Sequence, residues 1–196
     1  MLLREVHVAP VAEVQVWAAV GSADEEPGQG GLAHFHEHML FKGTERRGVG
    51  EITAAVEGVG GRINAYTSFD VTCYHATLPS AELSVGLEVL ADSVQHSLFD
   101  PDEIDHEIEV VLEEIRSAED DPHHVLSDAL FRTAYQVHPY RDPILGSAEE
   151  VAGFSHEKLS GFYRRWYTPD KLVVVAVGDF EKTRILEEIR ALFAEA

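Results

Sequence analysis

Two neighbouring stretches of alternating residue character constrain the fold most strongly. Residues 62–68 and 71–78 are rich in β-branched and aromatic side chains, and only Phe69 and Asp70 separate them. This pattern predicts two paired strands joined by a tight turn. Apolar residues at helical spacing lie on both sides of the pair, so strands and helices interleave along the chain. We therefore predict an α+β fold in which helices cover a mainly antiparallel or mixed sheet.

Apolar periodicity and helix-starting residues predict the remaining elements. Asp100 followed by Pro101 is a strong helix start, because aspartate caps free N–H groups and proline suits the first helical turn. Ser80 is likewise expected to cap a helix. No long linker divides the chain, so we expect one domain over residues 1–196. Further strands are expected at 8–20 and 171–177, and helices at 32–41, 52–59, 83–94, 101–118, 125–135, 155–167 and 181–193.

Composition excludes several classes of protein. Fifteen Lys and Arg residues against 35 Asp and Glu residues give a net charge of −20, which repels phosphate backbones and disfavours a nucleic-acid partner. The same charge would attract basic peptides, or its only effect would be to keep the protein soluble. The only cysteine, Cys73, excludes a disulfide scaffold, and no apolar run approaches the ~20 residues of a membrane span. With one cysteine and no recognisable signal sequence, we expect a cytoplasmic protein.

The candidate chemistry is concentrated in the segment His34-Phe35-His36-Glu37-His38. Each helical residue turns by about 100°, so His38 lies about 40° and Glu37 about 60° from His34. Histidines at i and i+4 can bind one metal ion, with the glutamate beside it. His36 lies about 200° around the helix, on the apolar side, and is not expected to be a ligand. The bare pattern also fits two solvated histidines beside an acid.

A third ligand decides between these interpretations, because a catalytic zinc ion takes three protein ligands and a water molecule. In the helix expected at 101–118, Glu114 and Glu107 border the buried face, whereas Glu113 falls on the solvent side. We predict Glu114 as the third ligand, because a carboxylate at the margin of a core needs a charged partner. Glu107 could support the metal ligands or be a solvated glutamate. The buried face is formed by Ile104, Ile108, Val111 and Ile115.

Three segments resemble motifs of one known family. Gly31–Thr44 contains His-x-x-Glu-His, the inverzincin signature, and Glu107–Glu114 is similar to a second motif. Glu114 follows His38 by 76 residues, which suits the spacing of the third ligand in that family. Gly60–Ser68 resembles an edge strand on which substrates dock. The chain thus resembles the pitrilysin, insulysin and mitochondrial processing peptidase family of zinc peptidases.

The resemblance implies a zinc-dependent metalloendopeptidase that hydrolyses peptides or small unfolded proteins. His34, His38 and Glu114 would hold Zn²⁺, which lowers the pKa of its bound water to roughly 7. Glu37 would take the proton of the attacking water and pass it to the leaving amine. Glu107 would support the metal ligands.

The resemblance also implies a substrate-binding strand and a domain arrangement. Substrate would bind as an added strand along Asn64 and Ala65. Family members usually carry two homologous halves, so we expect residues 1–196 to form the N-terminal catalytic domain without the second half. The expected partners are peptides, with basic ones favoured, and either a homologous second half-domain or a second copy of the chain. The alternative is a non-catalytic or partner-dependent half-domain, acting as a structural or interaction subunit.

Overall fold

The computed structural model describes residues 1–194, which form a five-stranded mixed sheet with the strand order β1-β5-β2-β4-β3. β1 pairs with β5 in parallel, and all other neighbouring strands are antiparallel. The predicted α+β fold with a mixed sheet is therefore confirmed. The strands are β1 (Leu2–Glu5), β2 (Val11–Ala18), β3 (Arg62–Thr67), β4 (Thr72–Pro79) and β5 (Leu172–Gly178).

The predicted hairpin is present as β3 and β4, with β3 at one edge of the sheet. Its register pairs Ala65 with Tyr74 and Thr67 with Thr72. The strand predicted over residues 8–20 is shorter in the structure, where β2 runs only from Val11 to Ala18, so both predicted ends are wrong. A turn interrupts it before Val11, and the N-terminal residues instead form β1, which pairs with the distant β5. A proline at position 10 fits this turn, because proline cannot donate to a strand ladder.

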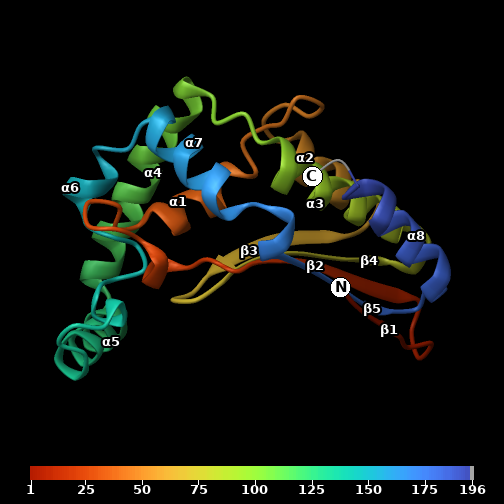
Figure 1. Cartoon of the computed structure of the whole chain (residues 1–196), viewed down its shortest axis with the longest axis horizontal. Coiled ribbons are helices and arrows are strands. Elements are labelled where there is room, and N and C mark those ends of the chain that lie inside the picture. Colours follow the sequence, from red (N-terminus) through yellow and green to blue (C-terminus); the bar gives the residue numbers. More distant parts are fainter. Residues whose placement is uncertain (195–196) are drawn as a thin grey trace.

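Helices cover one face of the sheet. In Figure 1 most of them lie above it, α5 lies lower, beyond one end of the sheet, and no helix of residues 1–194 covers the lower face. The α-helices are α1 (Leu32–Met39), α2 (Glu51–Glu57), α3 (Leu83–His96), α4 (Pro101–Asp120), α5 (Pro122–Ala134), α6 (Ala148–Val151), α7 (His156–Trp166) and α8 (Lys182–Leu192). Short 3₁₀ turns are formed by Ser22–Asp24, Ser80–Glu82, Pro139–Arg141 and Pro169–Lys171.

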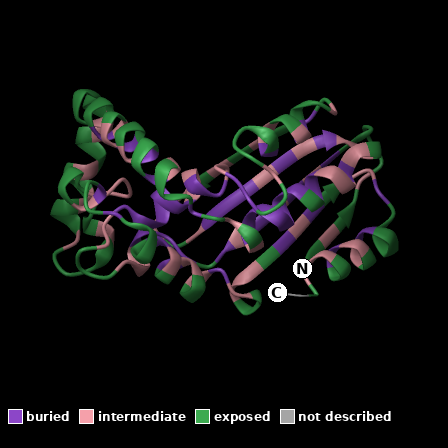
Figure 2. Ribbon diagram, turned by 90° about the horizontal axis from the view of Figure 1, so that it is seen from above, coloured by how far each residue is buried: buried purple, intermediate pink, exposed green. Residues whose placement is uncertain are grey.

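The core lies between the sheet and these helices. Burial alternates along β2, where every second side chain is buried beneath the helices and those between are partly exposed (Figure 2). α3 packs very closely on β4 at Gly86, because a Cβ there would lie 2.5 Å from a Leu78 methyl carbon. The largest buried side chains include Tyr74, Phe35, Leu32, Met39, Ile52 and Leu87.

Two predicted helix starts have different outcomes. Asp100 caps α4 by accepting a hydrogen bond from the backbone N–H of Asp102, as expected, and Pro101 occupies the first turn. Ser80 does not cap a helix. It begins a 3₁₀ turn, and α3 starts only at Leu83. Within residues 1–194, no helix has both the length and the apolar character needed to cross a bilayer.

Candidate metal centre

The site is built on α1, a helix of only eight residues whose start is held from outside. Gly31 precedes it with a φ of 86°, a left-handed conformation that favours glycine. A Cβ at Gly31 would also lie 2.4 Å from the backbone oxygen of Leu145. The carboxylate of Glu25 accepts hydrogen bonds from the backbone N–H groups of Gly31 at 3.0 Å and Ala33 at 2.7 Å. A side chain from the preceding loop therefore satisfies the free amides of α1.

The histidines of α1 divide between two faces, as their spacing predicts. His34 and His38 lie one turn apart with ring centroids 4.6 Å apart and Nε2 atoms 3.3 Å apart. His36 points the other way into the core and is fully buried. Its ring nitrogens lie 2.9 Å from the backbone oxygens of Leu32 and Leu159, so this ring joins α1 to α7. His36 is thus turned away from the other two rings.

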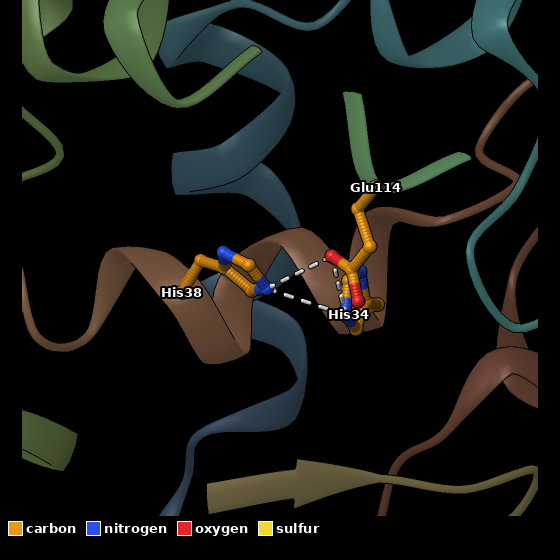
Figure 3. Close-up of side chains that lie close together, drawn as sticks. All are labelled: His34, His38 and Glu114. Atoms are coloured by element: carbon orange, nitrogen blue, oxygen red, sulfur yellow. Dashed lines mark hydrogen bonds and ion pairs between the residues drawn. The ribbon is translucent and has the colours of Figure 1, made fainter. Parts of the chain in front are cut away.

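α4 brings Glu114 to these rings from 76 residues further along the chain (Figure 3). Its Oε2 lies 3.6 Å from Nε2 of His38 and 3.7 Å from Nε2 of His34. The side chain of Glu114 is 43% exposed, against 75% for Glu113, which pairs with Arg116 on the outside of the helix. One ligand atom from each of His34, His38 and Glu114 lies within 4.8 Å of the others. The structure therefore brings the three predicted side chains together.

Burial and charge give the two imidazoles different proton affinities. Burial, with the neighbouring His38, lowers the pKa of His34 to about 4, so this ring is neutral at physiological pH. Burial also acts to lower the pKa of His38. The hydrogen bond to Glu107 and the charges of Glu107, Glu114 and Glu37 outweigh this effect, so the pKa of His38 is raised above 6.5. His38 is thus the imidazole that holds a proton more readily.

The donor set fits a zinc ion. Nδ1 of His38 lies 2.7 Å from Oε1 of Glu107, so Nδ1 carries the hydrogen and Nε2 of the neutral ring offers a lone pair. That lone pair faces a second imidazole nitrogen and the carboxylate oxygen of Glu114, which is an acceptor only. When both rings are neutral, these acceptors converge on a position that suits a cation. Tetrahedral zinc with bonds of about 2.0–2.1 Å separates its ligands by roughly 3.3–3.4 Å, close to the separations of these atoms.

Glu37 lies on the side of α1 that carries His34 and His38, and it faces the edge strand β3. Its Oε2 accepts a 2.6 Å hydrogen bond from the hydroxyl of Thr67 on β3. Burial raises the pKa of Glu37, while the Thr67 hydrogen bond and the charge of His38 act in the opposite direction. A carboxylate whose pKa is moved toward neutrality is suited to exchanging protons with a substrate.

The two predicted substrate residues lie side by side on β3. Ala65 is partly buried on the same face as Thr67, and Asn64 is exposed on the opposite face. Oδ1 of Asn64 accepts a 2.9 Å hydrogen bond from the N–H of Ala65. This amide is therefore bonded by a side chain rather than by the neighbouring strand.

Glu107 is buried beside the site and contacts two basic side chains. Its Oε1 faces Nδ1 of His38, and its Oε2 lies 2.5 Å from Nζ of Lys42. Burial acts to raise the pKa of Glu107, but the contacts with His38 and Lys42 outweigh it and lower that pKa. Of the two interpretations of Glu107, the structure favours the supporting residue over the solvated one, because only 3% of Glu107 is exposed.

Sequence reasoning missed the roles of Thr67, Lys42 and Glu25. Lys42 follows His38 by four residues, and this spacing could have placed it on the same helix face. Thr67 lies two residues after Ala65, and strand alternation could have placed it on the face of that residue. Neither spacing predicts which residue the side chain of Lys42 or Thr67 contacts. For Glu25 the sequence carries no such signal, since a loop residue shows no periodicity.

The fold and the donor set together define a metallopeptidase domain of the pitrilysin-like class. The chain belongs to the family described as Insulinase (Peptidase family M16), which matches residues 1–148. Residues 153–196 match a domain described as the Peptidase M16 inactive domain. The predicted family resemblance is therefore confirmed.

Relatives with known names agree with this assignment. An uncharacterized zinc protease of Streptomyces coelicolor is 35% identical over 181 residues, which cover 92% of this chain and 39% of the relative. A probable mitochondrial-processing peptidase subunit beta of Arabidopsis thaliana is 37% identical over 187 residues, 95% of this chain and 35% of the relative. The crystal structure of a protease from Helicobacter pylori has a TM-score of 0.92 at 33% identity, over 97% of this chain and 47% of that protein. The chain spans less than half the length of these relatives.

Proposed function

We propose that this chain is the metal-binding half of a zinc-dependent metalloendopeptidase that hydrolyses peptides or small unfolded proteins. One observation carries the proposal: Nε2 of His34, Nε2 of His38 and Oε2 of Glu114 converge at 3.3–3.7 Å beside the carboxylate of Glu37. These three residues would hold the ion. The names of the relatives, several of them zinc proteases, support Zn²⁺ as the metal.

The proposed role of each residue follows from the position of its side chain. When bound, zinc lowers the pKa of its water to about 7 and polarises the scissile carbonyl group. Glu37 takes the proton of the attacking water and returns it to the leaving amine. The Thr67 hydroxyl holds one oxygen of Glu37, so the other oxygen is free to exchange the proton. Glu107 orients the ring of His38 from the far side.

The edge strand β3 is the proposed docking site for the peptide. β3 lies at the end of the sheet, so one side of its backbone has no neighbouring strand within residues 1–194. The N–H of Ala65 becomes available to an extended peptide once the side chain of Asn64 moves away. Backbone hydrogen bonds then supply affinity, and side-chain pockets supply selectivity.

An acidic cavity near the site supports a preference for basic peptides. The cavity of about 970 Å³ lies between α4, α5 and the loops that precede α1 and α6. Ile115, which follows Glu114 on α4, is part of its wall, and Arg132 is the one Lys or Arg side chain among its lining residues. Its acidic lining residues are Glu26, Glu119, Asp128, Asp142 and Glu150, together with Glu25, whose pKa burial raises to about 8 so that it adds little charge at neutral pH.

Metal analysis and a peptide-library digest of matched variants test the proposal. The wild-type chain should bind one zinc ion and cleave peptides. Glu37→Gln should keep the zinc and lose cleavage, because the amide cannot accept the proton. Glu114→Gln should weaken zinc binding, whereas the neighbouring exposed Glu113→Gln should leave it unchanged. Retained turnover in Glu37→Gln would exclude Glu37 as the proton acceptor.

A second candidate is a half-domain that needs a partner for activity, or that serves as an interaction subunit. The observation that favours it is coverage: the chain accounts for 35–47% of the relatives described above. The same experiment separates the two candidates. A wild-type chain that binds zinc stoichiometrically yet cleaves no peptide, and remains monomeric on size exclusion, would favour the partner-dependent form.

A further inference from the structure

A short chain of charged contacts leads from the metal centre to Lys42. Nδ1 of His38 lies 2.7 Å from Oε1 of Glu107, and Oε2 of the same carboxylate lies 2.5 Å from Nζ of Lys42. The side chain of Glu107 is 4% exposed and that of Lys42 is 28% exposed. The Glu107 carboxylate is thus fixed between a ring that faces the proposed metal position and an ammonium group at the rim.

We propose that Lys42 is a positioning residue for the metal centre, which fixes the carboxylate of Glu107 and through it the ring of His38. The inference rests on the proposed function, because it requires that His38 be a metal ligand. Lys42 touches neither His34 nor Glu114, so its influence on the metal passes through Glu107.

The physical argument begins with the cost of burying a carboxylate. Both oxygens of a buried carboxylate need a partner, since an unsatisfied charged oxygen is expensive in a dry environment. The Nδ1–H of His38 can serve only Oε1. No hydrogen bond from elsewhere in residues 1–194 reaches Oε2, so the ion pair with Lys42 is the compensation for that oxygen. Removing the ammonium group would let the carboxylate turn toward solvent and away from His38.

Charge balance strengthens the role of Lys42 when metal is present. An imidazole that binds a metal is neutral, so His38 then offers Glu107 a neutral donor only. Lys42 becomes the cation that faces this buried anion. Residues that orient a metal-binding histidine in this way typically change metal affinity by 10–100-fold when mutated.

A purely structural role predicts a different result. Lys42 follows the C-terminal end of α1, where any cation interacts favourably with the helix dipole. In that case its loss would lower the stability of the chain without acting through Glu107. Zinc affinity in a double-mutant cycle distinguishes the two roles, because coupling appears only if Lys42 and Glu107 act together.

The test uses the full chain stripped of metal and titrated with zinc against a chromophoric chelator. Lys42→Met should weaken zinc binding about tenfold, and Lys42→Arg, which keeps the charge, should restore most of the affinity. Glu107→Gln should weaken binding by a similar factor, and the double variant no further. Lys182→Met, at the start of α8, is the matched control and should leave affinity unchanged. Lys42→Gln replaces Lys42→Met if circular dichroism shows that the latter fails to fold.

Two results would overturn the inference while leaving the proposed function intact. One is wild-type zinc affinity in both uncharged Lys42 variants. The other is an equal loss from Lys42→Met in the wild-type and Glu107→Gln backgrounds, which would mean that Lys42 acts independently of Glu107. A wild-type chain that binds no zinc would overturn the inference and the proposed function together.

Discussion

The hydroxyl of Thr67 donates a 2.6 Å hydrogen bond to Oε2 of Glu37 and so links the edge strand β3 to α1, the helix that carries His34 and His38. The strand proposed to receive the substrate therefore also fixes the residue proposed to move the proton. A peptide docked on β3 and the carboxylate of Glu37 would thus both be positioned by the same strand.

Removing this hydroxyl should slow catalysis without preventing metal binding. Hydrogen bonds to charged groups contribute about 1.5–3 kcal/mol, so Thr67→Val should lower kcat about ten- to a hundredfold. Steady-state kinetics on a fluorogenic peptide, combined with zinc analysis, measures both quantities. Thr67→Ser keeps the hydroxyl and should retain most of the activity. Wild-type kcat in Thr67→Val would show that Glu37 needs no such support.

Zinc affinity should fall as the pH falls, through the proton on His38. The pKa of His38 is raised above 6.5 in the metal-free protein, so zinc must displace this proton below that pKa. The pKa of His34 is about 4, so that ring releases no proton near pH 6. One proton is then exchanged, and the apparent Kd should rise about tenfold per pH unit below the pKa of His38. Chelator competition between about pH 5.5 and 8 measures this slope; a flat profile would contradict it.

Glu25 should contribute to the stability of α1 by capping it. Glu25→Ala removes the acceptor for the N–H groups of Gly31 and Ala33, and loss of a helix cap costs about 0.5–2 kcal/mol. The unfolding midpoint should drop by roughly 2–4 °C per kcal/mol in a chain of this size. Glu57→Ala, at an exposed position of α2, is the control and should change little. Equal midpoints for the two variants would exclude a capping role.

Asp92 should be one of the most sensitive buried positions outside the metal centre. Its Oδ2 accepts a hydrogen bond from the Thr44 hydroxyl at 2.8 Å and pairs with Nη1 of Arg47 at 2.5 Å, which anchors the loop after α1 to α3. Arg47 is partly exposed and keeps its ion pair with Glu88, so the loss of Asp92 should cost about 1–3 kcal/mol, the range for an unsatisfied buried partner. Urea unfolding of Asp92→Ala should show a loss of this size, against almost none for the exposed Asp105→Ala. A loss below 1 kcal/mol would mean that solvent reaches Arg47 easily.

Local geometry explains which parts of the site could be predicted from the sequence. His34 and His38 share a helix face because their spacing alone fixes the angle between them. Glu114 could be preferred to Glu113 because the apolar residues of α4 identify its buried face. Ile104, Val111 and Ile115 are indeed buried, whereas Glu113 is largely exposed. In each case the deciding pattern lies within a single helix.

The parts that could not be predicted depend on contacts between distant segments. The contact of Lys42 with Glu107 spans 65 residues, and that of Thr67 with Glu37 spans 30. No periodicity within one element encodes either partner. β1 was missed for the same reason. It is four residues long and largely exposed, and only its parallel partner β5, near the other end of the chain, makes it a strand.

Because α1 is so short, it cannot by itself hold the side chains of His34 and His38 in the positions that a metal ion would require. An isolated helix of eight residues is unstable in water, since helices below about 12–15 residues are marginal even in favourable sequences. A synthetic peptide covering this helix would present both imidazoles on a fluctuating coil. The proposed metal site therefore depends on the folded tertiary structure, and limited proteolysis that removes the segments packed against α1 should also abolish zinc binding.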